Sequence, residues 1–204
     1  MKLYYKPGAC SLASHIALTE SGAVFQLEQV DTAAGKTASG QDYLAINPKG
    51  YVPALELDDG RVITEGAAIL QYIADQHPDA ALAPAAGTFE RAKLQEHLNY
   101  VASELHKSFS PFFTGEKIED EARSAFAEKV LARMQQVEAI LADGRSYLGG
   151  NVFSVADAYL FVVSNWANFV DISLDSVPRL KAFVTRVAGR AATQSAMKAE
   201  GLIG

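Results

Sequence analysis

The sequence predicts a two-domain protein, of class α/β in its first part and all-α in its second. Residues 1–80 change repeatedly between the two-residue alternation of a strand and the longer periodicity of an amphipathic helix. Residues 77–87 are rich in proline and alanine, which is typical of an interdomain linker. The remainder of the chain shows only helical patterns. We therefore expect an α/β domain over residues 1–80 and a helical-bundle domain over residues 87–204.

Turn signals set the expected order of elements in the first domain. Asp59-Gly60 lies between two alternating runs and predicts a hairpin turn. Pro53 cannot donate to a strand ladder, so it marks either a strand start or a cis bend. The small, polar segment 31–41 indicates a mobile loop. The predicted ranges are strands at 3–5 and 25–30, helices at 9–21, 42–46 and 65–77, and a hairpin over 50–64.

The second domain is expected to be a helical bundle built around one apolar helix. That helix opens at Ser154, and Asp157 stands three residues later, so the two predict a capping box rather than a catalytic carboxylate. Its apolar residues cover nearly all sides, which is typical of a helix in the centre of a bundle. The other helices are expected over 89–113 and 120–142, ending near Gly144, from Pro178 onward, and over 191–202.

Composition excludes several classes of function. The formal net charge is −6 and the pI about 5.2, which disfavours nucleic acid or an anionic membrane as a partner. One cysteine excludes a disulfide framework and fits a reducing cytosol. No apolar run approaches the roughly 18 residues of a membrane span, and Lys6-Pro7 interrupts the start of the chain before a signal-peptide core. We expect a cytoplasmic protein without a membrane partner.

The single cysteine, Cys10, lies where the first strand gives way to the first helix. Unpaired backbone N–H groups and the helix dipole favour a thiolate in a first helical turn. The alternative is a small buried apolar residue. The segment Cys10-Ser11-Leu12-Ala13 lacks the second cysteine of a C-x-x-C redox site, so it cannot close a disulfide of its own. A second sulfur would have to arrive with a ligand, and glutathione is the abundant small thiol of the cytosol.

Two further places have residues suited to binding or catalysis. Glu65-Gly66 ends a strand and starts a helix, where free N–H groups suit a carboxylate and Glu65 suits an amine; simple helix capping is the alternative. On the long helix, Asn99, Ser103 and His106 fall on one polar face, and a solvated histidine is the alternative for His106. No cluster has the spacing of metal ligands, so no metal is expected. We interpret His15 and His77 as surface or packing residues, and the charged segment 116–123 as surface.

These residues together resemble a known family. The segments that carry the resemblance are the strand–Cys10–helix opening, Tyr51-Val52-Pro53-Ala54-Leu55, Thr64-Glu65-Gly66-Ala67-Ala68-Ile69, Glu104-Leu105-His106-Lys107 and Ser154-Val-Ala-Asp157-Ala-Tyr-Leu-Phe. The chain resembles a bacterial beta-class glutathione S-transferase over essentially its full length. The resemblance implies a thioredoxin-like first domain, a helical second domain and a homodimer.

The resemblance also implies a glutathione site. Cys10 would lie near the glutathione sulfur and form a mixed disulfide with it, with Ser11, His106 and Lys107 around the same position. Val52, before a cis Pro53, would pair its backbone with the cysteinyl part. Glutathione-binding roles are further implied for Glu65 and Gly66 at the γ-glutamyl end and for Asn99, Ser103 and Glu104, partly from the neighbouring subunit. The loop lysine that usually meets the glycyl carboxylate is replaced by Gly35, and Lys36 is its expected substitute.

The implied activity is conjugation of glutathione to small hydrophobic electrophiles, with Cys10, Ser11 and His106 as the catalytic candidates. Favouring and orienting the glutathione thiolate would lower the barrier. One alternative is thiol–disulfide exchange or peroxide reduction through a Cys10–glutathione adduct. Another is a glutathione-binding protein of low turnover. Candidate walls for the electrophile are Phe109, Phe112, Phe113 and Trp166, although a bundle core would contain aromatic residues as well.

Overall fold

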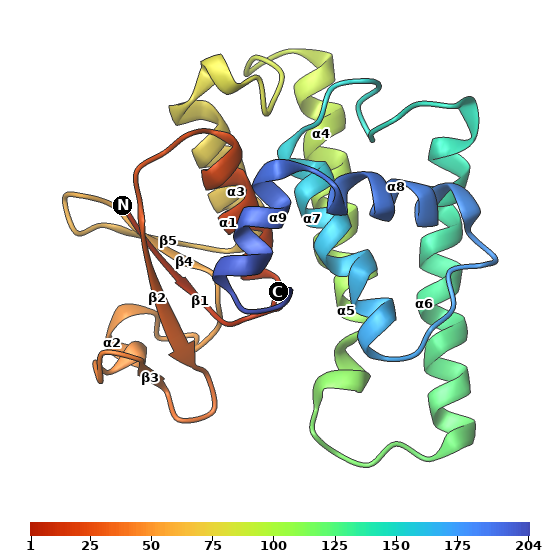
Figure 1. The fold of residues 1–204 in the computed structure, drawn as a ribbon, viewed down its shortest axis with the longest axis horizontal. Helices are drawn as coiled ribbons and strands as arrows, with labels where there is room; N and C mark the ends of the chain where they lie inside the picture. The colour runs from red at the N-terminus through yellow and green to blue at the C-terminus, as the bar shows by residue number, and fades with distance from the viewer. The chain divides into compact units, whose positions relative to one another are not determined.

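A computed structural model describes residues 1–204 and confirms the predicted class (Figure 1). Its contacts divide the chain into two compact units. The first contains Met1–Ala83 together with Gly189–Gly204, and the second contains Pro84–Ala188. The range 87–204 that we expected for the second domain therefore includes a C-terminal segment whose contacts group it with the first unit.

The first unit is built on a mixed sheet of order β3-β2-β1-β4-β5. The central strand β1 (Lys2–Tyr5) runs parallel to β2 (Gln26–Asp31) and antiparallel to β4 (Ala54–Glu56), which forms the predicted hairpin with β5 (Val62–Thr64). An edge strand, β3 (Lys36–Thr37), was not predicted, because two residues are too short to show an alternation. Part of the segment predicted as a mobile loop is therefore a strand paired to β2.

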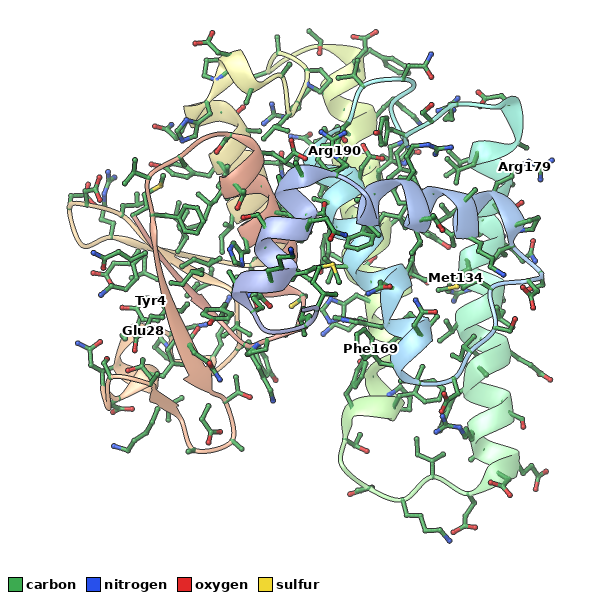
Figure 2. The ribbon with its side chains drawn as sticks, in the orientation of Figure 1. Tyr4, Glu28, Met134, Phe169, Arg179 and Arg190 are labelled. Atoms are coloured by element: carbon green, nitrogen blue, oxygen red, sulfur yellow. The ribbon has the colours of Figure 1, made fainter.

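Helices cover both faces of this sheet. Residues of β1 alternate between the faces, so Tyr5 approaches His15 of α1 (Ser11–Glu20) while Tyr4 packs against Tyr43 of α2 (Tyr43–Ile46). Figure 2 labels Tyr4 in this position on the sheet. α1 is in turn flanked by α3 (Gly66–Gln76) and α9 (Ala191–Ala199), and a short 3₁₀ turn, η1 (Pro78–Ala80), follows α3.

The first helix begins later than the sequence indicated. α1 starts at Ser11, and Cys10 is its N-cap, although no side-chain capping bond forms there. The prediction of a helix from Ala9 was therefore wrong by two residues. Residues 6–9 instead close a turn in which the amide of Ala9 donates to the carbonyl of Lys6 at 3.0 Å.

The second unit is helical throughout. Its elements are α4 (Phe89–Tyr100), the π-helical turn η2 (Val101–Leu105), α5 (His106–Ser108), the 3₁₀ turn η3 (Ser110–Phe113), α6 (Asp120–Ile140), η4 (Leu141–Asp143), α7 (Val155–Asn165), η5 (Trp166–Phe169) and α8 (Pro178–Ala188). No helix of the chain is both long enough and apolar enough to span a membrane.

α7 is the buried helix that the sequence predicted. Every one of its residues from Val155 to Ser164 is buried, and α7 contacts both α4 and α8. The capping box is confirmed, because Asp157 accepts hydrogen bonds from the amide and hydroxyl of Ser154 at 2.9 and 2.6 Å. Met134 of α6, labelled in Figure 2, is also fully buried in this unit.

The helix expected over 89–113 is not continuous. The amide of His106 donates to the carbonyl of Val101, five residues earlier, which closes a π turn in the middle of the segment. A 3₁₀ turn at η3 then ends the helical run. Because a π turn advances less per residue than an α-helix, side chains after it point in a different direction from the one that α-helical spacing predicts.

Candidate functional site

The Cys10 thiol lies between the start of α1 and the backbone of Val52 in the first unit. The side chain is partly buried, and its sulfur donates to the carbonyl of Val52 at 3.3 Å. The thiol is thus beside the Val52–Pro53 peptide bond, which is cis. The structure therefore brings together two of the predicted site segments that are far apart in the sequence.

Ser11 lies deeper than its neighbour. Its side chain is fully buried, and its hydroxyl bridges the backbone of Lys6, accepting from the amide at 3.2 Å and donating to the carbonyl at 3.3 Å. These bonds hold the turn that carries Cys10. In this structure the hydroxyl of Ser11 therefore forms its hydrogen bonds with the backbone of Lys6.

The segment next to Cys10 is held in place by two buried polar side chains. The hydroxyl of Tyr43 and the side-chain amide of Asn47 both donate to the carbonyl of Tyr51, each at 2.7 Å. Burial raises the pKa of Tyr43, so it remains a neutral donor. Tyr43 and Asn47 thereby position Val52 against Cys10. The sequence did not indicate this role, because Tyr43 lies in a segment interpreted only as a short helix and Asn47 directly follows that segment.

The Glu65–Gly66 corner forms the N-terminus of α3. Glu65 is the N-cap residue and has a φ of 71°, a left-handed conformation that is costly for a residue with a side chain. Its carboxylate does not cap the helix; it is 69% exposed and accepts from Lys49 at 2.6 Å. The alternative of side-chain capping by Glu65 is therefore not what the structure shows, and its carboxylate faces solvent beside the free end of α3.

The other residue proposed in the first unit is at the sheet edge. Lys36 lies in β3 with an exposed side chain. The preceding Gly35 has a φ of 65°, which a glycine adopts without strain and a lysine would not. The backbone at this position therefore suits the glycine of this sequence.

In the second unit, His106 turns inward instead of sharing a polar face with Asn99 and Ser103. Asn99 and Ser103 are exposed, whereas Nδ1 of His106 is 2.8 Å from the hydroxyl of Tyr159 on α7. The predicted common face was wrong, because the π turn rotates His106 away from it. The imidazole packs edge-to-face on Trp166, with ring centroids 4.8 Å apart.

Burial determines the charge of this histidine. Desolvation, aided by the positive charge of Lys107, lowers the pKa of His106 to about 4. The ring is therefore neutral at neutral pH and has one donor and one acceptor nitrogen. In the tautomer where Tyr159 donates to Nδ1, Nε2 carries the hydrogen and can donate to an anionic sulfur.

The predicted aromatic residues form one cluster in the second unit. Trp166 contacts Phe109 and Phe113 with centroid distances of 5.7 and 5.2 Å, and Phe109 also approaches Phe112 at 6.4 Å. Phe109 is fully buried, but Phe113 is 53% exposed. The cluster therefore has a buried part that belongs to the core and an exposed edge that can contact an apolar molecule.

The remaining predicted residues lie along one side of η2 and α5. Ser103, Glu104 and Lys107 line a shallow cavity of about 340 Å³ together with residues of α6. Glu104 forms an ion pair with Arg133 at 2.9 Å, and the hydroxyl of Ser103 donates to the carbonyl of Asn99. No three histidine, cysteine or acidic side chains come together anywhere in the chain in a way that could hold a metal ion.

Comparisons with known proteins place this geometry in a family. Residues 8–76 match the family described as glutathione S-transferase, N-terminal domain, and residues 90–191 match glutathione S-transferase, C-terminal domain. The chain is 47% identical over 202 residues to glutathione S-transferase GstA of Escherichia coli O157:H7, covering 99% of this chain and 100% of that protein.

Solved structures agree with the family matches. A ternary complex of BphK, a bacterial transferase, is 57% identical with a TM-score of 0.94 and covers 99% of this chain and 100% of its own. A beta-class enzyme from Sphingomonas chungbukensis and a sphingomonad enzyme complexed with glutathione are each 48% identical, with TM-scores of 0.94 and 0.93 and full coverage of both chains. The chain belongs to the glutathione S-transferase family, a class of enzymes that conjugate glutathione to electrophiles. Within that family, its similarity is to the bacterial beta class.

Proposed function

We propose that the protein conjugates reduced glutathione, as co-substrate and without a metal, to small hydrophobic electrophiles. The observation that carries the proposal is the position of the Cys10 thiol, 3.3 Å from the carbonyl beside the cis Val52–Pro53 bond, in a chain of this family. The partly buried, polar surroundings of this thiol suit the binding and orientation of the glutathione sulfur. The exposed ring of Phe113, which packs against the buried Trp166, supplies apolar surface for an acceptor.

We assign the γ-glutamyl end of glutathione to the start of α3. Backbone N–H groups at the helix N-terminus suit the α-carboxylate, and the exposed Glu65 carboxylate suits the α-amine. Lys49, which pairs with Glu65, would be displaced or shared on binding. Lys36, Val52, Pro53 and Gly66 complete the proposed set in this unit.

In the second unit we assign catalytic support to His106 and glutathione contacts to Asn99, Ser103, Glu104 and Lys107. The support for these assignments is the resemblance to the beta class, together with the neutral, hydrogen-bonded state of His106. The domain boundaries at 80 and 87 and a cytoplasmic location belong to the same proposal.

A panel of electrophiles and hydroperoxides assayed with glutathione would test the activity. We expect thioether formation with at least one apolar electrophile, and absence of turnover across the whole panel would contradict the proposal.

For the binding site, Glu65→Ala should weaken glutathione affinity about tenfold in calorimetry, because one charge-assisted contact is lost. Lys49→Ala is the matched control: it removes the partner of Glu65 but leaves the carboxylate. Equal affinity in Glu65→Ala and the unchanged protein would remove this corner from the site.

A second activity is favoured by one feature of Cys10. The thiol is the N-cap of α1 and partly accessible, where the helix N-terminus stabilises a thiolate. We propose that Cys10 also exchanges with oxidised glutathione: the thiolate attacks one sulfur of the disulfide, a mixed disulfide forms, and one reduced glutathione leaves.

We propose, finally, that the protein is a homodimer at micromolar concentration. The exposed Asn99 and Ser103 lie on the helical segment that the family resemblance assigns to the subunit boundary, and symmetric dimers are the commonest small assemblies. Light scattering should return about twice the chain mass of 21.9 kDa. A single species at the chain mass would contradict the proposal.

A further inference from the structure

A buried carboxylate in the first unit touches the chain on both sides of Cys10. It belongs to Glu200, directly after α9, and its side chain is 0% exposed. Oε2 accepts from the amide of Gly8 at 3.0 Å, and Oε1 is 2.9 Å from Nδ1 of His15. Gly8 precedes Cys10 by two positions and His15 follows it on α1. One side chain from a distant part of the chain is therefore bonded to both ends of the segment that carries the thiol.

The partners of Glu200 have little freedom to move away. The ring of His15 lies 5.6 Å from that of Phe25 and 6.3 Å from that of Tyr5. Gly8 has a φ of 72°, and a Cβ added there would meet Leu202 at 3.4 Å, so the backbone of the turn lies close to the C-terminal segment. A buried carboxylate that lost either donor would be strongly destabilised. The three groups therefore act as one fixed arrangement.

The opposite end of α9 has its own attachment to α1. Arg190, labelled in Figure 2, donates through Nε and Nη2 to the two carboxylate oxygens of Glu20 at 2.6 and 3.0 Å. Glu20 is the last residue of α1, whereas Cys10 precedes its first. Both attachments hold α9 on α1, but the Arg190–Glu20 pair is at the end of α1 remote from Cys10. The Arg190–Glu20 pair therefore serves as a control, because weakening it loosens the packing of α9 on α1 without touching the turn that carries Cys10.

We propose that Glu200 is a positioning residue for Cys10. By holding the amide of Gly8 and the imidazole of His15, it fixes the turn that presents the thiol at the N-terminus of α1 and beside Val52. The turn also has local bonds, from Ala9 to Lys6 and between Ser11 and Lys6, but these close within a few residues. Glu200 ties that local turn to the body of the unit. The proposal rests on the proposed function only in taking Cys10 to be the protein thiol of the glutathione site.

The test uses the fact that Cys10 is the single cysteine, so alkylation of the whole protein by iodoacetamide reports this thiol alone. Two variants are compared, Glu200→Gln and Glu200→Ala. Both remove the negative charge, but glutamine retains an acceptor for the amide of Gly8. The difference between them therefore measures the positioning bond. We expect Glu200→Ala to be alkylated at least about threefold more slowly than Glu200→Gln, because raising a thiol pKa by half a unit lowers the thiolate fraction about threefold.

The control is Glu20→Gln, which weakens the other attachment of α9. We expect its alkylation rate and its thiol pKa, measured from ultraviolet thiolate absorbance, to equal those of the unchanged protein. Equal rates in Glu200→Ala and Glu200→Gln would overturn the proposal, and so would a Glu20→Gln variant slowed as much as Glu200→Ala. Should Glu200→Ala fail to fold, hydrogen exchange decides: the proposal requires a protected Gly8 amide in the unchanged protein, and exchange at the rate of an open loop contradicts it. Alkylation needs no glutathione, so this result and a failure of the conjugation assay are distinguishable.

Discussion

At the scale of single residues, two side chains carry most of the proposed chemistry and are prepared in different ways. Cys10 is positioned by backbone groups: it is the N-cap residue of α1, and its thiol donates to the carbonyl of Val52 at 3.3 Å. His106 is prepared by burial, which keeps its ring neutral, and by Tyr159, which holds one of its nitrogens. A neutral, fixed imidazole can donate a hydrogen bond without adding a charge to the site.

Substitution of Cys10 separates the two proposed activities. In conjugation the attacking sulfur belongs to glutathione, so Cys10→Ala should keep more than about a tenth of the rate, a loss of less than ~1.4 kcal/mol in transition-state stabilisation. Thiol exchange should disappear, because no other cysteine can replace Cys10. Mass spectrometry after incubation with oxidised glutathione should show one added glutathione, removed by reductant, in the unchanged protein only.

The matched control for this experiment is Ser11→Ala, which leaves the thiol in place but removes the hydroxyl that bridges Lys6. It should still accept glutathione as a mixed disulfide. A Cys10 that stays unmodified in excess oxidised glutathione would contradict the exchange activity, and loss of both activities in Cys10→Ala would show that the thiol is needed for conjugation too.

At the scale of secondary-structure elements, helix ends and one irregular turn decide where the functional side chains lie. The π turn η2 places His106 against α7 while leaving Asn99 and Ser103 at the surface. π turns inside α-helices often occur at functional sites, which agrees with this arrangement. The start of α7 is regular by contrast: a buried capping box fixes the helix that carries Tyr159.

The capping box gives a prediction about stability. Asp157 is fully buried and accepts three hydrogen bonds, from the amide of Leu148 and from the amide and hydroxyl of Ser154. Asp157→Ala should lower the free energy of unfolding by about 2 to 4 kcal/mol, because buried donors lose their partner and the helix loses its cap. Denaturant unfolding followed by circular dichroism measures the change.

Glu119→Ala is the control for this prediction. Glu119 is the N-cap residue of α6 but makes no capping bond, and its ion pair with Lys117 is exposed. We expect its effect to stay within about 0.5 kcal/mol. Similar losses in the two variants would mean that the buried hydrogen bonds of Asp157 contribute little.

At the scale of the whole molecule, the chain divides into two compact units, and its last helix belongs to the first of them. α9 is attached to α1 by a buried pair at one end and an arginine–carboxylate pair at the other. The C-terminal segment is therefore part of the structure that supports Cys10. Its removal should affect the thiol and not only the second unit from which it emerges.

The pH dependence of stability is a whole-molecule consequence of His106. Its pKa is about 4 in the folded state and about 6.5 when unfolded, so between these values the unfolded state binds more protons. The free energy of unfolding should therefore fall as pH drops from 6.5 to 4, by about 3 kcal/mol from this group. Fluorescence of Trp166, the single tryptophan and a ring contact of His106, provides the unfolding signal.

The comparison variant is His106→Gln, which can still bond to Tyr159 but does not titrate. Burial also lowers the pKa of His97, and that contribution remains in both proteins. The difference between the two proteins should thus isolate His106. Parallel pH profiles for the unchanged protein and His106→Gln would show that the imidazole is not held neutral.

Much of the fold could be predicted because the signals are local. Strand alternation, the Asp59-Gly60 turn, the capping box and the glycine that ends η4 each act over a few neighbouring residues, where the chemistry of the chain decides the backbone. The same locality explains the errors. Strand β3 is too short to show a period, and a π turn has no composition that distinguishes it from an α-helix.

The sequence by itself determined the class of the protein, the candidate residues Cys10, Glu65 and His106, and the apolar central helix. Only the tertiary structure decided which distant side chains form hydrogen bonds with His106 and with the segment around Cys10. Tyr159 meets His106 from 53 residues away, and Glu200 meets His15 from 185 residues away. Such partners leave no periodic or spacing signal, because a hydrogen bond between distant segments depends on how sheet and helices pack. The physical reason is that local patterns select backbone conformation, whereas burial and pairing of polar groups are properties of the assembled fold.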